Sequence, residues 1–400
     1  MKKILYLVTE DSYFCSHRLE LAAFIKQEGY EVAVATKCSI NNNKYKQLIS
    51  QHQLKLFELK FFNRTSFINL FKELLAIYEL YNIYKKFKPD IVHHIALKPI
   101  IYGTIAANLT KTNKIINAFA GLGFIFTDNN YINFKLKLKL KKYFFKTIIF
   151  NLLKFICNNK NNKILLLQNE DDLTTLKKII NINKINLQAK IIQGSGILTK
   201  QYLDVKPLEF TNNSNNINIK IALVARLLWT KGIREFVRAS EYIQNYIKTH
   251  NLAIKPEFII YGDIDFKNPA FIDYATINNW QKQGLITWKK FCNNIIEAYA
   301  ACHIAVLPSY REGLPKSLLE AALCARAIVT TNVPGCKEIV EDGINGYLVP
   351  KEDSLALANS LLKLMQNQDL MVNMGIAGRK KVCNEFSADI IFPKMLELYS

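Results

Sequence analysis

The residues best suited to chemistry are two glutamates, Glu312 and Glu320, which are separated by seven residues. The apolar run Ile304–Leu307 before them predicts a buried strand, and Pro315 indicates the first turn of a helix. Glu312 would then lie beside a helix N-terminus, where free amide groups and the helix dipole favour phosphate. Glu320 would lie about 7.5 Å along the helix axis, at ~1.5 Å per residue. Two such carboxylates can hold the hydroxyl-bearing ends of a molecule with a diphosphate between them. The alternative is a strand–loop–helix unit with two solvated glutamates.

Two cations form a second candidate group. Arg226 and Lys231 lie five residues apart, between a predicted strand, Ile219–Val224, and a predicted helix, Ile233–Tyr246. The guanidinium can bind two phosphate oxygens at once and the ammonium acts as a point charge, so the pair can converge on one diphosphate. With the two glutamates, these cations predict an anion site in the second half of the chain.

The first half carries a third group of polar side chains. Ile4–Thr9 predicts a strand and Leu19–Gln27 a helix, and the loop between them contains Ser16, His17 and Arg18. A second strand follows the helix, and this β-α-β opening predicts a parallel, doubly wound sheet with ligands at the carboxyl ends of its strands. The loop is therefore a candidate binding site, although a single arginine after a strand can also be a solvated helix cap.

Two histidines, His93 and His94, end a further predicted strand, Ile91–Ile95, and Lys98 follows at the start of the next helix. Neighbouring side chains of a strand point to opposite faces, so at most one imidazole can face a ligand. We favour His94 and keep His93 as the alternative, and either one can instead be a packed or surface histidine.

The elements that carry these groups fall into two sets. The strand–helix pattern restarts at Ile219, and four hundred residues are too many for one ordinary core. The sequence thus predicts an α/β fold with a first domain over 1–205, an Asn-rich linker over 206–218 and a second domain over 219–380. After a further strand of the first domain, Gly121 and Gly123 would let the backbone approach a ligand closely.

The net charge of +20 is concentrated in the first half. Residues 1–200 hold 31 Lys and Arg against 13 Asp and Glu, or +18, and residues 201–400 hold 22 against 20, or +2. Residues 133–157 alternate lysines with large apolar side chains and contain no acid, which is typical of an interfacial helix on anionic lipid. The same segment can be a core helix with a solvated lysine face, and its beginning also fits a strand. No nucleic-acid-binding motif accompanies it.

The compartment follows from the cysteines and the hydropathy. The eight cysteines form no C-x-x-C pair and no zinc spacing, which fits a reducing cytosol. No run of about 18 apolar residues could span a bilayer. We therefore expect a cytoplasmic protein that is peripheral on the inner face of the cytoplasmic membrane.

Four motifs in order resemble one enzyme family. These are Ser16-His17-Arg18-Leu19, Gly121-Leu122-Gly123, the Arg226/Lys231 pair and the Glu312-x7-Glu320 block. The chain resembles the retaining glycosyltransferases of family 4, in particular the subgroup that builds bacterial capsule, O-antigen and lipid-linked oligosaccharides. The resemblance covers essentially the whole chain. It implies a GT-B fold, with two Rossmann-like domains facing a cleft and a C-terminal helix over 381–400 that packs back on the N-terminal domain.

The resemblance also implies an activity. A hexose or N-acetylhexosamine would pass from a nucleoside diphosphate sugar, UDP-linked in our interpretation, to a polyprenyl-diphosphate-linked sugar in cell-envelope polysaccharide synthesis, with retention of configuration. Glu320 would bind the ribose and Glu312 the sugar, Arg226 and Lys231 would stabilise the departing diphosphate, and His94 would lie near the donor sugar. The donor side would also include Gly262, Gly313, Leu314, Pro315 and Leu318. The acceptor side would include Ser16, His17, Arg18, His93, Lys98, Gly121 and Gly123.

The resemblance further implies that no metal or other cofactor is needed. Asp263 and Asp265 form a D-x-D pattern that holds a metal in other glycosyltransferases, but here they follow a strand of GT-B type and we interpret them as loop residues. Two alternatives remain. One is a GT-B sugar-nucleotide 2-epimerase, which shares the fold without both anion-site motifs. The other is a non-enzymatic membrane- or nucleic-acid-binding protein, which would explain the charge of the first half alone.

Overall fold

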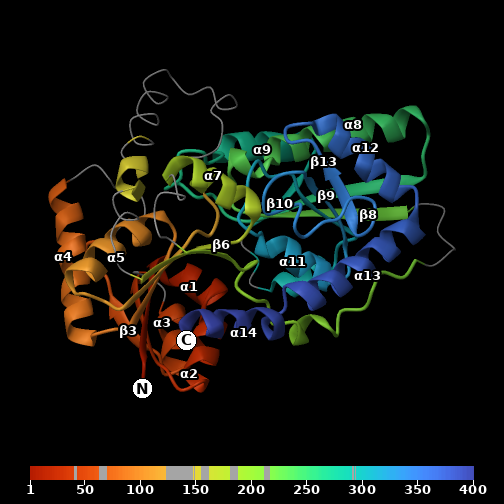
Figure 1. Ribbon diagram of the computed structural model, residues 1–400. Coiled ribbons are helices and arrows are strands. Elements are labelled where there is room, and N and C mark those ends of the chain that lie inside the picture. Colours follow the sequence, from red (N-terminus) through yellow and green to blue (C-terminus); the bar gives the residue numbers. More distant parts are fainter. Residues whose placement is uncertain are drawn as a thin grey trace. The chain divides into compact units, whose positions relative to one another are not determined.

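The computed structural model describes residues 1–39, 43–62, 70–122, 147, 149–154, 162–180, 188–210, 217–290, 292 and 294–400. These residues form two compact units (Figure 1). The first contains the described residues up to Gly196 together with Ala388–Ser400, and the second contains those of Ile197–Ser387. Residues 197–205 and 381–387 therefore belong to the second unit, whereas the sequence assigned them to the first domain and to the C-terminal helix.

Within the described residues, the first unit contains a seven-stranded parallel sheet. Its spatial order is β3-β2-β1-β4-β5-β6-β7. The strands are β1 (Lys3–Glu10), β2 (Glu31–Lys37), β3 (Lys55–Glu58), β4 (Ile91–Ile95), β5 (Lys114–Ala118), β6 (Asn162–Leu167) and β7 (Gln188–Ile191). The order reverses between β1 and β4, which is the position where open α/β sheets bind ligands.

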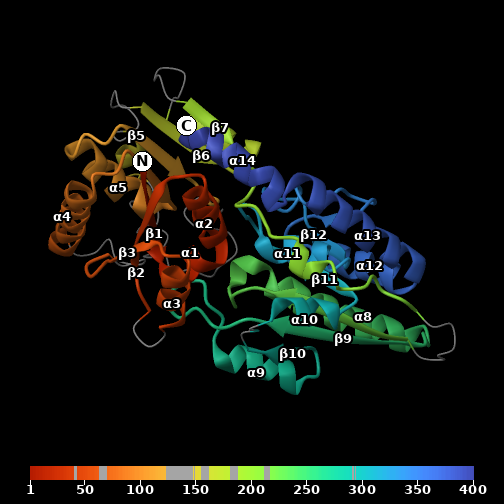
Figure 2. The ribbon, with the colours of Figure 1, turned by 90° about the horizontal axis from the view of Figure 1, so that it is seen from below.

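Helices cover both faces of this sheet. One face packs against α4 (Leu70–Phe87), α5 (Leu97–Leu109) and α7 (Glu170–Ile180) through an apolar cluster that includes Leu5, Val92 and Leu165. The other face packs against α1 (Asp11–His17), α2 (Leu19–Gln27), α3 (Lys44–Gln51) and α14 (Ala388–Tyr399). Figure 2 shows α4 and α5 on one side of the strands and α2 and α14 on the other.

The C-terminal helix α14 is anchored in the first unit by buried polar contacts. The Tyr399 hydroxyl lies 2.9 Å from the Tyr6 hydroxyl and 2.6 Å from His93 Nδ1. Phe392 and Met395 of the same helix pack in the apolar cluster on the α2 face of the sheet. The last helix of the chain is thus part of the core of the first unit.

The second unit contains a parallel sheet of the same topology. Within the described residues its order is β10-β9-β8-β11-β12-β13, and the reversal lies between β8 and β11. Its strands are β8 (Ile217–Val224), β9 (Ile254–Tyr261), β10 (Thr287–Lys289), β11 (Ile304–Leu307), β12 (Ala327–Thr331) and β13 (Gly346–Val349). Its helices are α8 (Ile233–Thr249), α9 (Tyr274–Lys282), α10 (Ile295–Ala300), α11 (Lys316–Leu323), α12 (Ser354–Met365) and α13 (Gln368–Glu385), with short 3-10 turns at Lys200–Tyr202 and Trp229–Lys231.

Several elements differ from the sequence interpretation. The region 10–18, predicted as a loop, contains the helix α1. The helices α3 and α9 and the strand β3 were not predicted. Of the segment 133–157, only residues 147 and 149–154 are described; they are helical, and Ile149 and Leu153 are buried in the core shared with α5. The rest of that segment lies outside the described residues. No helix among the described residues is both long and apolar enough to cross a membrane.

Candidate donor site in the second unit

The predicted anion-site residues of the second half lie at the reversal point of the second sheet. Arg226 and Lys231 follow β8, and Glu312 follows β11, the strand that pairs with β8. Neighbouring parallel strands end at the same edge, so the two loops meet there. The structure thus brings the loop of the two cations together with the loop of Glu312, as the sequence predicted.

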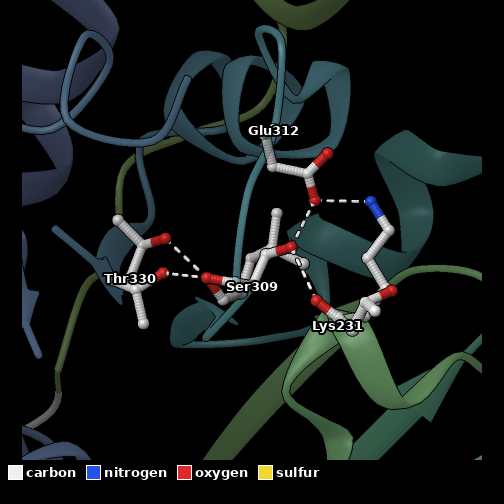
Figure 3. Close-up of polar contacts among 7 residues, drawn as sticks. Lys231, Ser309, Glu312 and Thr330 are labelled. Atoms are coloured by element: carbon white, nitrogen blue, oxygen red, sulfur yellow. Dashed lines mark hydrogen bonds and ion pairs between the residues drawn. The ribbon is translucent and has the colours of Figure 1, made fainter. Parts of the chain in front are cut away.

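Lys231 and Glu312 form an ion pair in this site (Figure 3). The side chains are 19% and 12% exposed, so the charges are partly withdrawn from water. Ser309 Oγ donates to the same carboxylate oxygen, Oε1, at 2.6 Å. Both contacts use Oε1, and the second oxygen of a carboxylate can accept further hydrogen bonds.

The loop that carries Glu312 is fixed by its surroundings. The Thr331 hydroxyl donates to the Ser309 carbonyl, and Thr330 Oγ1 donates to the Leu307 carbonyl at 2.6 Å. Two glycines with positive φ let neighbouring backbone approach closely. A Cβ on Gly232 would lie 1.9 Å from the Pro308 carbonyl oxygen, and a Cβ on Gly335 would lie 2.7 Å from the Gly313 oxygen. The site is therefore built on tight backbone packing, which favours a defined geometry.

Arg226 is held by an aspartate of the loop after β9. Its Nη1 donates to Asp265 Oδ2 at 2.7 Å, and the Arg226 side chain is 53% exposed. Backbone bonds tie the two loops together: Leu227 N donates to the Asp263 carbonyl at 3.0 Å, and Trp229 N donates to the Ala270 carbonyl at 2.9 Å. Asp265 thus pairs with Arg226, the residue that the sequence predicts to bind phosphate. Among the described residues, no group of three or more His, Cys, Asp and Glu side chains is arranged to hold a metal ion.

Glu320 lies on α11 in a largely apolar setting, with 8% of the residue exposed. Burial raises the pKa of its carboxyl, and the Lys316 ammonium, 3.4 Å away, opposes that effect. The Tyr202 hydroxyl donates to the same oxygen at 3.4 Å. Such a carboxyl gains from any additional donor, such as a ligand hydroxyl, because desolvated charge is costly when it is weakly paired.

The remaining predicted donor residues lie around this site. Gly262 follows β9, and its carbonyl accepts from the Trp288 indole at 2.8 Å. Gly313 and Leu314 lead into α11, and Pro315 is its N-cap residue rather than part of the first turn. Leu318 is 1% exposed and packs in the core. The side chain therefore has no exposed surface with which to make the predicted contact with the donor, because it packs α11 against the core.

The predicted acceptor residues after β1 differ in their environment. Ser16 is exposed, and its Oγ lies 2.6 Å from His17 Nδ1. The His17 ring stacks on the Tyr13 ring, with the ring centroids 4.4 Å apart. Arg18 is 2% exposed and so is not a solvated cap. Its Nε and Nη1 atoms have no hydrogen-bond partner among the residues that the structure describes. Burial raises the pKa of Tyr6, Tyr13 and Tyr399, and the Arg18 charge opposes that rise.

The two histidines point to opposite faces of the sheet, as strand geometry predicts, but both are fully buried. His93 contacts Tyr399, whereas His94 Nε2 lies 2.9 Å from the Tyr84 hydroxyl and its Nδ1 lies 2.9 Å from Asn117 Oδ1. Burial lowers the pKa of His94 to about 4. Burial, and then the Arg18 charge, lower the pKa of His93. The catalytic role predicted for His94 needs an imidazole ring that a substrate can reach. In this structure the rings of His93 and His94 are both buried.

Lys98 is also withdrawn from solvent. Its ammonium pairs with Glu73 at 2.8 Å, and its side chain is 4% exposed. Ala96, two residues before it, has a φ of 78°, which is uncommon for a residue with a Cβ and marks a sharp turn after β4. Gly121 lies after β5 with a φ of 84°. Gly123 lies outside the described residues.

A cluster of three side chains that supports the Glu312 loop was not predicted from the sequence. The Tyr310 hydroxyl donates to Glu235 Oε2 at 3.0 Å and lies 3.3 Å from Arg234 Nη2. Glu235 is 2% exposed, and Arg234 Nε donates to its other oxygen at 3.0 Å. A charged pair at the start of α8 was visible in the sequence, but its contact with Tyr310 spans 75 residues and has no local signal.

Comparisons with known proteins match both units to glycosyltransferase family models. The family model described as Glycosyl transferase 4-like matches residues 3–159, and that described as Glycosyl transferases group 1 matches residues 218–367. The chain is 25% identical, over 96% of its length and 94% of the relative's, to N,N'-diacetylbacillosaminyl-diphospho-undecaprenol alpha-1,3-N-acetylgalactosaminyltransferase of Campylobacter jejuni. It is 26% identical, over 83% of its length and 80% of the relative's, to UDP-Gal:alpha-D-GlcNAc-diphosphoundecaprenol alpha-1,3-galactosyltransferase of Escherichia coli.

Solved structures agree on the fold. HepE of Anabaena, in a complex with UDP and glucose, matches with a TM-score of 0.73 at 15% identity, over 100% of this chain and 99% of that one. Sucrose-phosphate synthase of Thermosynechococcus elongatus matches with a TM-score of 0.76 at 16% identity, over 100% and 98% of the two chains. At these identities the likeness concerns the fold alone.

Proposed function

Because the chain belongs to the family 4 glycosyltransferases with the GT-B fold, we propose that it transfers a hexose or N-acetylhexosamine from a UDP-sugar to a polyprenyl-diphosphate-linked sugar, with retention of configuration. The product would be an intermediate of a cell-envelope polysaccharide. The protein would act in the cytoplasm, peripherally on the inner face of the cytoplasmic membrane, and would need no metal.

One observation carries the donor half of the proposal. At the reversal point of the second sheet, two cations of one loop, Arg226 and Lys231, are each paired with a carboxylate, Asp265 and Glu312. A diphosphate can replace the carboxylates as the anionic partner of both cations, because phosphate oxygens accept the same charge-assisted hydrogen bonds. The exchange frees Glu312 to bind hydroxyl groups.

The roles of the residues follow from this arrangement. Transfer breaks the bond between the anomeric carbon and the diphosphate oxygen, so negative charge develops on the leaving group. Arg226 and Lys231 would stabilise that charge, and preorganised charges are most effective where charge develops. Glu312 would accept from the sugar hydroxyls, and Glu320 from the ribose hydroxyls. The acceptor hydroxyl would attack from the face that the diphosphate leaves.

The acceptor half of the proposal has separate support. The two relatives described above are named for acceptors linked to undecaprenol through a diphosphate. A net charge of +18 on residues 1–200 suits an anionic acceptor and an anionic membrane. We propose that Ser16 and His17 contribute to this side, and that residues 133–157 contribute to membrane contact.

The test is a screen of radiolabelled UDP- and GDP-sugars against extracted lipid-linked acceptors. We expect label to enter the lipid fraction from one UDP-sugar, and only when acceptor is present. Label that enters the lipid fraction from a GDP-sugar and from no UDP-sugar would contradict the proposed donor.

Two controls separate the other function classes. A sugar-nucleotide 2-epimerase would convert the UDP-sugar without any acceptor, so the nucleotide fraction is analysed for a new epimer. A non-enzymatic binding protein would leave every donor unchanged. The anion site in the nearly neutral second half favours the enzyme, because a surface that only binds membrane or nucleic acid has no need of the half-buried Glu312 and the buried Glu320 there.

A further inference from the structure

The aspartates of the D-x-D pattern, Asp263 and Asp265, have no assigned role in the proposed function. Both lie in the loop after β9, and Asp265 Oδ2 accepts from Arg226 Nη1 at 2.7 Å. Arg226 is the proposed ligand of the donor diphosphate. An acidic side chain that already occupies this guanidinium bears directly on how the site binds anions.

Asp265 is held in place by its loop. A backbone hydrogen bond of 3.0 Å from Leu227 N to the Asp263 carbonyl joins the loops after β8 and β9. A turn follows the aspartate, in which Asn268 N donates to the Asp265 carbonyl at 2.9 Å. The Asp265 side chain is 11% exposed and that of Arg226 is 53% exposed. The carboxylate therefore has a defined position, and the guanidinium is the partner that a ligand can reach.

A diphosphate and the Asp265 carboxylate compete for the same cation. Carboxylate and phosphate oxygens both accept charge-assisted hydrogen bonds from a guanidinium. If the guanidinium leaves Asp265 for the diphosphate, one ion pair is lost. If the guanidinium bridges the two, the carboxylate stays beside the diphosphate and repels it, because both are negatively charged. In both arrangements Asp265 weakens the binding of the diphosphate.

This effect is larger for the product of sugar transfer than for the donor. Transfer breaks the bond between the anomeric carbon and the terminal phosphate oxygen, and the electron pair of that bond stays on the oxygen. The acceptor oxygen bonds to the anomeric carbon, and its proton passes to the solvent. A terminal phosphate has a second pKa of about 6, so at pH 8 the released nucleoside diphosphate carries more negative charge than the sugar donor. The Asp265 carboxylate repels this additional charge.

We propose that Asp265 lowers the affinity of the site for the nucleoside diphosphate and thereby promotes its release after sugar transfer. When the diphosphate leaves, the carboxylate replaces it at the guanidinium, in the arrangement of the 2.7 Å ion pair. The role in product release rests on the proposed function. The competition for Arg226 concerns any nucleoside diphosphate that binds to this cation.

The test is isothermal titration calorimetry of the full chain with UDP at pH 8. Asp265→Asn keeps the shape of the side chain and removes its charge, and we expect it to bind UDP roughly three- to fivefold more tightly than the parent, which is the effect of a partly exposed ion pair. Asp263→Asn, at an exposed position of the same loop, is the matched control and should bind UDP like the parent. Equal or weaker binding of UDP by a folded Asp265→Asn would overturn the proposal, because an aspartate that only orients Arg226 strengthens binding.

Two measurements address product release. The methyl ester of UDP at its terminal phosphate lacks the additional charge, as a sugar donor does, so Asp265→Asn should gain less affinity for the ester than for UDP. The dissociation rate of UDP, measured by stopped flow, should be lower in the variant, because affinity differences between related complexes lie mostly in dissociation. An equal gain for ester and UDP, or an unchanged dissociation rate, would overturn the role in release.

A second pair of variants covers the folding of the loop and the part played by Arg226. Asp265→Ser also removes the carboxylate, and it replaces Asp265→Asn in every measurement if the asparagine disturbs the loop. In an Arg226→Gln background the competition is absent, so the removal of the carboxylate should increase UDP affinity less than it does in the parent. An undiminished increase in that background would overturn the part assigned to Arg226.

Failure of this inference and failure of the proposed function are distinguishable. A chain that transfers sugar from a UDP-sugar, but in which Asp265→Asn gains no UDP affinity, contradicts the inference alone. A gain in UDP affinity in a chain that transfers no sugar supports the competition while the proposed function fails. If the parent binds GDP and not UDP, the same variants are titrated with GDP, and only the proposed donor is contradicted. A parent that binds neither nucleotide would overturn both.

Discussion

At the scale of single residues, the donor site is defined by exchangeable ion pairs. Arg226 and Lys231 each have a carboxylate partner, and the Arg226 side chain is half exposed. The half-exposed Arg226–Asp265 pair contributes little to stability, so its exchange for a ligand anion costs little, whereas the Lys231–Glu312 pair is partly withdrawn from water. Glu320 differs, because burial already disfavours its charged form. We therefore expect that the residues proposed to bind the donor can be changed without loss of the fold.

We predict that Arg226→Ala and Glu320→Ala each remove most of the activity and leave the fold intact. Loss of a charged hydrogen bond to substrate costs roughly 1.5–3 kcal/mol, or about 10- to 100-fold in donor affinity, with a further loss in the transition state. The measurements are kcat and KM for the donor, with Tm as the folding control. Arg238→Ala and Glu241→Ala, at exposed positions of α8, serve as matched variants. Near-normal turnover of either site variant would remove its residue from the donor site.

The buried His94 predicts a pH dependence of stability. Its pKa is about 4 in the folded chain and 6.5 in its ordinary state. Between these values the unfolded chain binds the proton and the folded chain does not, so the free energy of unfolding falls as the pH decreases from 6.5 to 4. At ~1.4 kcal/mol per pH unit the full loss is about 3 kcal/mol.

Urea denaturation of the parent and of His94→Gln at pH 7 and pH 4.5 tests this. We expect the variant to be less stable at pH 7, because it loses the contacts with Tyr84 and Asn117, and the difference to narrow at pH 4.5. If the difference in unfolding free energy between the parent and the variant is the same at pH 7 and at pH 4.5, the imidazole is not held neutral in the folded chain.

At the scale of elements, the loop between β11 and α11 is the part that other elements must position. Tyr310 of this loop donates to Glu235, the Thr331 hydroxyl donates to the Ser309 carbonyl, and Gly232 packs closely against the Pro308 backbone. We predict that Tyr310→Phe lowers kcat several-fold and lowers stability by ~1–3 kcal/mol, because Glu235 is buried and loses a donor. Tyr274→Phe, at a residue 47% exposed on α9, is the control. A variant with the kcat and Tm of the parent would show that the Glu235 contact does not position the loop.

The loop after β9 supports Arg226 through Asp265, and we predict that the activity survives EDTA. Asp265 is engaged by a guanidinium at 2.7 Å, and a metal would have to compete with that pair. The measurement is transfer in the presence of excess EDTA, followed by addition of Mg²⁺ or Mn²⁺. Complete loss of activity that either ion restores would identify a metal requirement and would make Asp263 and Asp265 its first candidates.

Sequence patterns predicted the elements with strong periodicity and missed the short ones. The helix at Leu19–Gln27 begins and ends as predicted, because its apolar spacing is helical and Gly29 follows it. The helix at Asp11–His17 is only seven residues long and mostly polar, so its sequence resembles a loop. Strand alternation predicted that His93 and His94 face opposite sides. It did not predict their burial, which depends on Tyr399 and Tyr84 from distant helices.

At the scale of the whole molecule, two doubly wound sheets follow from the repeated strand–helix pattern of the sequence. The restart at Ile219 falls within β8, the central strand of the second sheet. The side-chain contacts of each site join residues that are far apart in the sequence, so no local sequence pattern predicts them. Lys231 and Glu312 are 81 residues apart, and His93 and Tyr399 are 306 residues apart. The sequence therefore predicted the candidate residues better than it predicted their partners.

The central claim is that the second unit holds a nucleoside diphosphate sugar so that its sugar is transferred with retention. The most direct measurement is the anomeric configuration of the product, read by NMR from the one-bond carbon–proton coupling at the new glycosidic linkage. With an α-linked UDP-sugar and a lipid-linked acceptor, the proposed mechanism predicts an α linkage in the product, formed by the parent and lost with Arg226→Ala. A β linkage formed by the parent from the same donor would contradict it.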